Sequence, residues 1–118
     1  MNISTKLETD KNEYKLGEEV VASITLLNEG DVEEEIFFKS GQRYDFVIKD
    51  GDQEVWRWSE GKMFTMATGT VTLEPGEKIS YVERLASDNL STGEYKLVGI
   101  VTGSPEYRES RVVLFRNK

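Results

Sequence analysis

The stretch EEVVASITLLNEG, residues 18–30, decides the fold, because its apolar residues recur with a period of two. Successive side chains of a β-strand point to opposite faces, so alternate residues of this stretch share one face. The residues expected on the buried face are Val20, Ala22, Ile24 and Leu26. The sequence Asn28-Glu29-Gly30 then has the composition of a turn. This pattern predicts a half-buried strand that ends at a turn.

The strand pattern continues on both sides of this stretch. Upstream, residues 3–7 alternate in the same way, and a break before residues 14–16 predicts a first strand that is split at a sheet edge. Downstream, residues 34–38 place Ile36 and Phe38 on one face. The spacing of the apolar residues therefore predicts strands throughout this part of the chain.

Two turn signals divide the rest of the sequence. Asp50-Gly51 predicts a tight hairpin, because glycine readily takes the positive φ that two-residue turns need. Pro75-Gly76 predicts a type II turn, with proline at the first corner and glycine at the second, between two further strands. The strand after the first hairpin carries Trp56 and Trp58 on one face.

The number of strands and one tyrosine predict the architecture. About eight or nine short strands at regular spacing are typical of a sandwich or barrel. Gly93-Glu94-Tyr95 opens the penultimate strand, at the position of the tyrosine corner of immunoglobulin-like sandwiches. We expect an all-β, immunoglobulin-like antiparallel β-sandwich that forms a single domain over residues 1–118.

The composition excludes several classes of functional site and partner. The 118 residues include neither Cys nor His, which excludes disulfides, thiolate metal sites and a histidine general base. The 22 acidic and 15 basic residues give a net charge of -7, which repels nucleic acids and anionic lipids. No window holds the ~20 apolar residues of a membrane span, and the N-terminus lacks the apolar run of a secretory signal. We expect a cytoplasmic protein that binds no cofactor, metal, nucleic acid or membrane.

The same absences argue against an enzyme. Serine and threonine have no histidine base for a triad, and short turns leave little room for a deep cleft around paired carboxylates. Asp50, Asp52 and Glu54 alternate like the first ligands of a calcium loop, but the later Gly and Glu of such a loop are missing. We expect these residues to form the hairpin turn instead, in a protein without catalytic residues.

Trp56 and Trp58 leave two interpretations open. Exposed indoles on a sheet stack sugars or bind proteins, whereas indoles inside a sandwich fill its core. Arg57 lies between the two in the sequence and points to the opposite face of the strand. We expect at least one of the two indoles to be mainly structural.

The segment SEGKMFTMA, residues 59–67, is the part that a sandwich core explains least. It is longer than a hairpin needs, and it presents Met63, Phe64 and Met66 close together. Methionine beside phenylalanine suits an adaptable protein interface. The alternative is a loop that folds its apolar residues over one end of the core.

Several motifs in and around this segment resemble one known family. They are Ser40-Gly41-Gln42, Tyr44-Asp45-Phe46, Trp56-Arg57-Trp58-Ser59, Lys62-Met63-Phe64-Thr65 and Leu73-Glu74-Pro75-Gly76-Glu77. The chain resembles the bacterial intracellular proteinase inhibitor family, the BsuPI domain, from about Leu7 to Val113. It departs from the family at Met66, where Gln often follows the Phe-Thr pair, and in its short connection from Ala67 to Thr72.

The resemblance implies a small cytoplasmic immunoglobulin-like domain that inhibits an intracellular subtilisin-type serine protease. Such a protease binds its substrate as an extended strand, so an inhibitor needs a rigid loop with apolar anchors. We expect Met63 or Phe64 to enter the primary pocket of the protease. The predicted contact residues are Trp56, Trp58, Ser59, Lys62, Met63, Phe64 and Thr65.

Other interpretations stay open at this point. Another loop end, residues 40–43, is the second candidate for the protease contact. The alternative function is a non-catalytic immunoglobulin-like binding or adhesion module, with a protein or glycan ligand and without protease inhibition. A glycan-binding module would expose Trp56 and Trp58 as coplanar rings, and an assembly domain would oligomerise through an edge strand. We expect a monomer.

Overall fold

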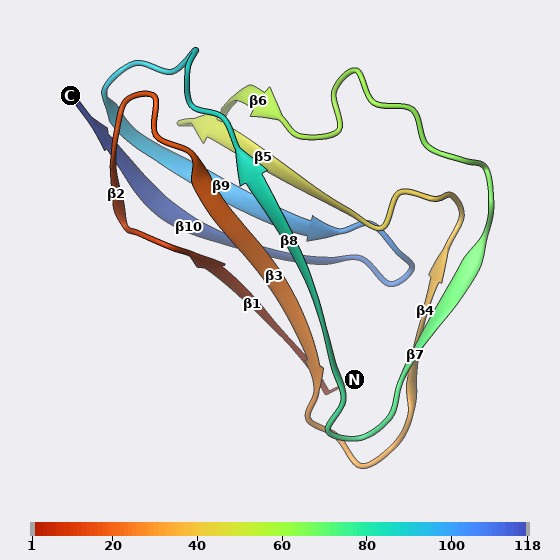
Figure 1. Cartoon of the computed structure of the whole chain (residues 1–118). Coiled ribbons are helices and arrows are strands. Elements are labelled where there is room, and N and C mark those ends of the chain that lie inside the picture. Colours follow the sequence, from red (N-terminus) through yellow and green to blue (C-terminus); the bar gives the residue numbers. More distant parts are fainter. Residues whose placement is uncertain (1, 118) are drawn as a thin grey trace.

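The computed structural model describes residues 2–117, which contain ten strands and no helix (Figure 1). The strands are β1 (Ile3–Thr9), β2 (Glu13–Lys15), β3 (Val20–Asn28), β4 (Glu34–Phe38), β5 (Tyr44–Asp50), β6 (Gln53–Arg57), β7 (Gly69–Leu73), β8 (Lys78–Leu85), β9 (Gly93–Val101) and β10 (Tyr107–Arg116). Valine, isoleucine, threonine and aromatic residues are frequent in them, because such side chains pack well on a pleated surface.

The strands form two main sheets and one small sheet. One main sheet has the order β1-β3-β8, and the other has the order β2-β10-β9-β5-β6. β4 and β7 pair with each other in the small sheet, and Phe37 of β4 also forms an isolated bridge with Ser104. In Figure 1 the three-stranded sheet lies in front of the five-stranded sheet, and β4 and β7 lie to one side.

The hydrophobic core lies between the two main sheets. β3 confirms the predicted alternation, because every second residue from Val20 to Leu26 is at most 2% exposed. The five-stranded sheet contributes Phe46, Ile48 and Leu97 to the same core. The two apolar faces exclude water from each other, which is the main favourable term in folding a sandwich. The prediction of an all-β sandwich is thus confirmed.

The first strands and Tyr95 give the sandwich its immunoglobulin-like character. The predicted split of the first strand is confirmed, because β1 pairs antiparallel with β3 whereas β2 pairs parallel with β10 in the other sheet. The Tyr95 hydroxyl donates to the Ser91 carbonyl at 3.0 Å, which confirms the predicted tyrosine corner. The described residues hold ten strands rather than eight or nine, because the two parts of the first strand count separately.

β5 and β6 form the hairpin that Asp50-Gly51 predicts, but the centre of the turn lies one residue further along the chain. Asp50 pairs with Gln53, so the two central residues of the turn are Gly51 and Asp52. Gly51 has a φ of 61°, a conformation that glycine adopts without steric cost. Glycine at the first central position is the arrangement of a type II′ turn.

The turn at Pro75-Gly76 forms as predicted, with Gly76 at a φ of 83°, but the strands beside it do not pair with each other. β8 pairs with β3 and β7 pairs with β4, so one two-stranded ribbon bends where β3 and β8 pass into β4 and β7. The side chain of Asn28 is buried at this bend and donates to the carbonyls of Val32 and Leu73. Burial of a polar side chain requires such hydrogen bonds, so Asn28 fixes the bend.

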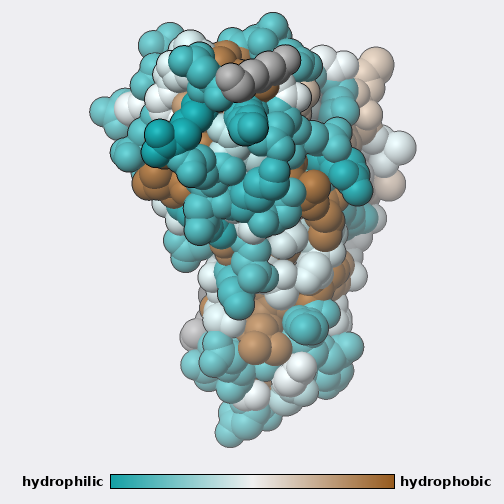
Figure 2. Space-filling view, turned by 60° about the vertical axis from the view of Figure 1, so that its left-hand side comes forward, coloured by the Kyte–Doolittle hydropathy of each residue, from teal (hydrophilic) through white to brown (hydrophobic). Residues whose placement is uncertain are grey.

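The bent ribbon makes the molecule long and narrow. Its principal extents are 47 × 30 × 22 Å. In Figure 2 the body tapers towards its lower end, which in Figure 1 is the end where the ribbon bends. The face in Figure 2 is mostly hydrophilic, with small separate hydrophobic patches. No candidate membrane-spanning helix occurs among the described residues.

Candidate functional site

The segment between β6 and β7, residues 58–68, is the projecting loop. It follows the outside of the molecule from the end of β6 to the start of β7 (Figure 1). Its first part is a pair of turns, in which Glu60 N donates to Arg57 O at 3.2 Å and Lys62 N donates to Ser59 O at 3.1 Å. Gly61 takes a φ of 78° within these turns. The loop thus has defined local structure although it belongs to no sheet.

The tip of the projecting loop presents Met63 to solvent. The Met63 side chain is 98% exposed and that of Met66 is 84% exposed. Phe64 behaves differently, because its ring packs on the ring of Trp58 at a centroid distance of 5.9 Å. Lys62 also turns back, with its Nζ 4.9 Å from the centroid of the Trp58 ring. Of the residues 62–64, only Met63 points away from the protein.

A column of aromatic rings supports the loop from below. Trp58 stacks on Tyr44 and Tyr44 stacks on Tyr81, both at a centroid distance of 4.8 Å. Phe46 packs edge-on against Tyr44 at 5.9 Å. Offset and edge-to-face ring pairs of this kind add favourable contacts beyond the area that they bury. The column connects the loop to β5 and β8.

Both tryptophans are half-buried and pack against the core. Trp58 has Tyr44, Phe64 and Lys62 against its ring, so it does not present a bare ring for stacking a sugar. Trp56 lies in β6, where it pairs with the buried Ile48. The exposed, coplanar indoles that a glycan-binding module would show are therefore not present.

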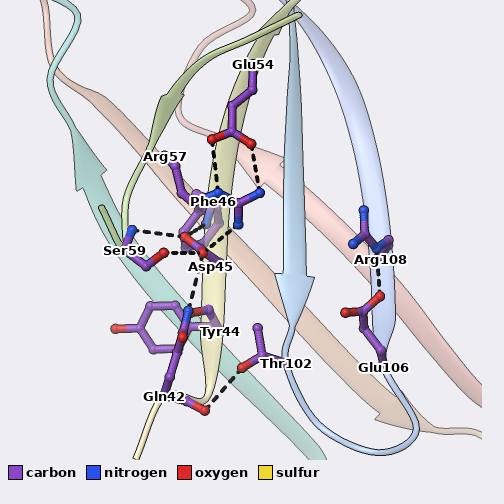
Figure 3. A network of polar contacts seen from close by, with 10 residues as sticks. All are labelled: Gln42, Tyr44, Asp45, Phe46, Glu54, Arg57, Ser59, Thr102, Glu106 and Arg108. Carbon is purple, nitrogen blue, oxygen red and sulfur yellow. Dashed lines mark hydrogen bonds and ion pairs between the residues drawn. The ribbon is translucent and has the colours of Figure 1, made fainter. Parts of the chain in front are cut away.

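Asp45 holds Ser59, the first residue after Trp58, in place (Figure 3). Its carboxylate is 2% exposed, on the face of β5 opposite to the aromatic column. Ser59 contacts it twice, because the Ser59 N–H donates to Oδ1 at 3.1 Å and the Ser59 hydroxyl donates to Oδ2. Arg57 Nη1 donates to Oδ2 at 2.8 Å, and Gln42 Nε2 donates at 3.3 Å. The N–H of Phe46 donates to Oδ1 at 2.9 Å.

Arg57 supplies the positive charge that a buried carboxylate needs. Its guanidinium lies between Asp45 and Glu54, and Nη2 donates to Glu54 Oε1 at 2.8 Å. These bonds raise the pKa of Arg57, mainly through Glu54 and then through Asp45. The hydrogen bond from Arg57 lowers the pKa of Glu54. A charged carboxylate is stable at low exposure only with such pairing and hydrogen bonding.

Gly41 holds the other side of the projecting loop. Its N–H donates to the carbonyl of Thr65 at 2.8 Å. A Cβ at position 41 would lie 2.4 Å from Thr65 Oγ1, closer than real side chains approach. A larger residue would have to displace the Thr65 side chain, so glycine suits this close contact. The segment from Gly41 to Asp45 therefore anchors the loop at both Ser59 and Thr65, and residues 40–43, the second candidate for contact, lie beside the loop.

The structure brings the predicted site residues together in three roles. Met63 is exposed, Lys62 and Phe64 cover Trp58, and Ser59 and Thr65 hold the loop. Trp56 packs against the core from β6 and so lies outside the projecting loop. The roles of Asp45 and Tyr44 were not predicted, although both occur in the motif Tyr44-Asp45-Phe46. An aspartate in a strand whose other residues are apolar was the available signal, because such a residue needs buried partners.

The buried Tyr14 and the half-buried Tyr44 give a test by alkaline titration. Burial, together with the hydrogen bond that the hydroxyl donates to Glu83, raises the pKa of Tyr44 to about 12. Burial and a hydrogen bond to Asp10 raise the pKa of Tyr14 to about 12. The folded pKa lies above the unfolded value of about 10, so the stability from these groups is complete below pH ~10 and is lost as the pH rises through ~12.

We expect an absorbance titration of tyrosinate to show a high-pH step that belongs to these residues. Tyr44→Phe should reduce that high-pH step by the absorbance of one tyrosinate. Ionisation of all tyrosines together near pH ~10 in the folded protein would contradict the environments described for Tyr14 and Tyr44.

The comparisons with solved structures agree with this fold. The sporulation control protein Spo0M from Bacillus subtilis is 15% identical with a TM-score of 0.66, over 100% of this chain and 51% of that one. A β-glucosidase, EmGH1, from Erythrobacter marinus is 14% identical with a TM-score of 0.54, over 97% of this chain and 15% of that one. A β-glucosidase from Listeria innocua is 17% identical with a TM-score of 0.52, over 96% of this chain and 16% of that one. The chain thus spans about half of Spo0M and a small part of the glucosidases. No curated protein proved similar.

The fold and the loop together define a small immunoglobulin-like domain with an exposed apolar side chain on an anchored loop. The chain belongs to the BsuPI family, described as intracellular proteinase inhibitor, whose sequence model matches residues 7–106. This confirms the resemblance seen in the central motifs. The description of this family is that of a proteinase inhibitor, and it is the starting point for the proposed function.

Proposed function

We propose that the protein inhibits a subtilisin-type serine protease and that Met63 enters the primary pocket of the enzyme. The observation that carries the proposal is the 98% exposure of Met63 on a loop that is held on both sides. Family membership supports the inhibitor function, and the geometry of the loop supports the choice of residue.

A side chain of this kind meets what a protease pocket requires. Methionine is unbranched, flexible and apolar, so it can fill a deep hydrophobic pocket and lose contact with water there. Exposed apolar side chains are ordinary on a surface, but one that is almost wholly exposed at the tip of an anchored loop is well placed to bind. Lys62 and Phe64 face Trp58, which leaves Met63 as the single anchor.

The anchors at Ser59 and Thr65 reduce the cost of binding. A flexible loop loses conformational freedom when a protease grips it, whereas a loop that is already ordered loses little. Ser59 is joined to Asp45 and Thr65 is joined to Gly41, so the backbone between them is restrained before the enzyme arrives. The predicted contact residues between Ser59 and Thr65 therefore form one restrained binding loop, and Trp58 supports it.

The further elements of the proposal concern compartment and stoichiometry. An inhibitor must meet its enzyme, so we propose that this protein acts in the cytoplasm on a protease of the same compartment. One projecting loop per chain implies that one monomer binds one protease. Size-exclusion chromatography of the protein alone and of its mixture with the protease would test both the monomer and the 1:1 complex.

The deciding experiment is a titration of an intracellular subtilisin-type protease with the purified protein, followed with a chromogenic peptide substrate. We expect loss of activity with an inhibition constant below about 1 micromolar, as is usual for protease–inhibitor interfaces of standard size. Full protease activity at about 50 micromolar of the protein, far above that constant, would contradict the proposal for that enzyme.

A further inference from the structure

We infer that Asp45 is the positioning residue of the projecting loop, and that it keeps the Met63–Phe64 peptide bond from being hydrolysed while a protease holds Met63. The inference rests on the proposed function, because it names what makes the same loop an inhibitor rather than a substrate. It goes beyond that function by assigning the role to a buried residue that the protease does not touch.

Asp45 lies where three segments of the chain meet in one polar network. Its carboxylate accepts hydrogen bonds from groups of three different segments, namely Gln42, the hairpin residue Arg57 and the loop residue Ser59 (Figure 3). Hydrogen bonds to a charged group are about twice as strong as bonds between neutral groups. Asp45 is thus the point at which the loop is joined to the sheet by charge-assisted bonds.

The carboxylate of Asp45 is also almost completely shielded from water. Asp45 is 2% exposed, so water cannot replace a lost partner at little cost. Both oxygens are used, since Oδ1 accepts from Ser59 and Phe46 and Oδ2 accepts from Ser59, Arg57 and Gln42. Movement of Ser59 away from the sheet would break two of these bonds together. The loop therefore has one strongly preferred position at its start.

The chain that follows Met63 is held in place too. Phe64 is held on Trp58 and Thr65 is held by Gly41, so the chain after the bond is restrained as well. Hydrolysis adds water across the Met63–Phe64 bond, which gives Met63 a carboxylate and Phe64 an amino group. The two new ends must separate before the product leaves the protease. With Ser59 fixed on one side and Phe64 and Thr65 on the other, that separation is slow.

Two variants test the inference. Asp45→Asn keeps the shape but places an NH2 group or a neutral oxygen opposite Arg57 and Gln42, and Ser59→Ala removes only the hydroxyl bond to Asp45. Ser87→Ala is the matched control, because Ser87 is also buried and its hydroxyl contacts Gly17 and Glu18 rather than the loop. For each protein, the inhibition constant, the thermal midpoint and the cleaved fraction by mass spectrometry are measured.

We expect Asp45→Asn to raise the inhibition constant about 10- to 100-fold, as the loss of hydrogen bonds to a charged group implies. It should also be cleaved between Met63 and Phe64 within a time in which the natural protein stays intact. Ser59→Ala should change both quantities in the same direction, by a smaller factor. Ser87→Ala should keep the natural inhibition constant and stay intact even with a lower thermal midpoint. If Asp45→Asn does not fold, the inhibition constant and the cleaved fraction of Ser59→Ala test the inference instead.

An Asp45→Asn variant that inhibits like the natural protein and stays uncleaved would overturn the inference and leave the proposed function standing. If the natural protein inhibits no subtilisin-type protease, the proposed function fails, and limited proteolysis by an unrelated broad-specificity protease decides the inference. Faster cleavage within residues 58–68 of Asp45→Asn than of the natural protein and of Ser87→Ala would then support a positioning role. Equal cleavage of the three would overturn it.

Discussion

Met63→Asp is expected to raise the inhibition constant against the target protease by about 100-fold or more. The natural side chain is 98% exposed and apolar, and we propose that it leaves water for a hydrophobic pocket on binding. A carboxylate at that position would have to lose its hydration inside the same pocket without a partner, which is strongly unfavourable. The folded state should be unaffected, because a side chain in solvent contributes little to stability.

Met66→Asp is the matched control for this prediction. Met66 lies three residues further along the same loop, has the same side chain and is 84% exposed. We expect its replacement to change the inhibition constant by no more than about threefold, as for residues at the rim of an interface. An effect of Met66→Asp that equals or exceeds that of Met63→Asp would show that the anchor has been assigned to the wrong methionine.

The second large effect is expected on stability, from two neighbouring phenylalanines of β4. Phe38→Ala should lower the free energy of unfolding by about 3–5 kcal/mol, because a buried ring is removed and a cavity remains. Phe38 is 0% exposed, and the Arg43 guanidinium lies 4.6 Å above its ring. Folded domains have only about 5–15 kcal/mol of stability in total, so this one change would remove a large part of it.

Phe37→Ala is the control, because the residue type and the strand are the same and only the face differs. Phe37 is 46% exposed, so we expect a loss of about 1 kcal/mol or less. Urea denaturation followed by tryptophan fluorescence measures both variants, and their slopes against urea should agree with that of the natural protein. Similar losses for the two variants would mean that β4 does not present one face to the core as described.

The sequence predicted β4 correctly in this respect, as it did β3. Both strands have an apolar residue at every second position, and burial of one face of a sheet preserves that period. The turns at Gly51 and Gly76 were predicted for a similarly local reason, since both residues take a positive φ that glycine reaches without strain. The tyrosine corner at Tyr95 depends on a bond to Ser91, only four residues away.

Other features were missed because they depend on residues far apart in the chain. The turn at Pro75-Gly76 was predicted, but not that β7 pairs with β4 and β8 with β3. Any strand with one apolar face can pair with several others, so the choice follows from how all the faces are buried together. The same holds for Asp45, whose partners Arg57 and Ser59 lie 12 and 14 residues away and meet it only through the pairing of β5 with β6.

For the candidate site too, some features could be predicted from neighbouring residues and others depended on the tertiary structure. The sequence by itself determined an all-β chain, its turns, the family and the segment from Ser59 to Thr65 as the candidate contact, because alternation, glycine positions and motifs are properties of neighbouring residues. Only the tertiary structure decided that Met63 faces solvent while Phe64 covers Trp58, and that Asp45 and Gly41 hold the loop. Exposure and buried hydrogen bonds are set by what the folded chain places beside a residue, and a linear pattern does not contain that information.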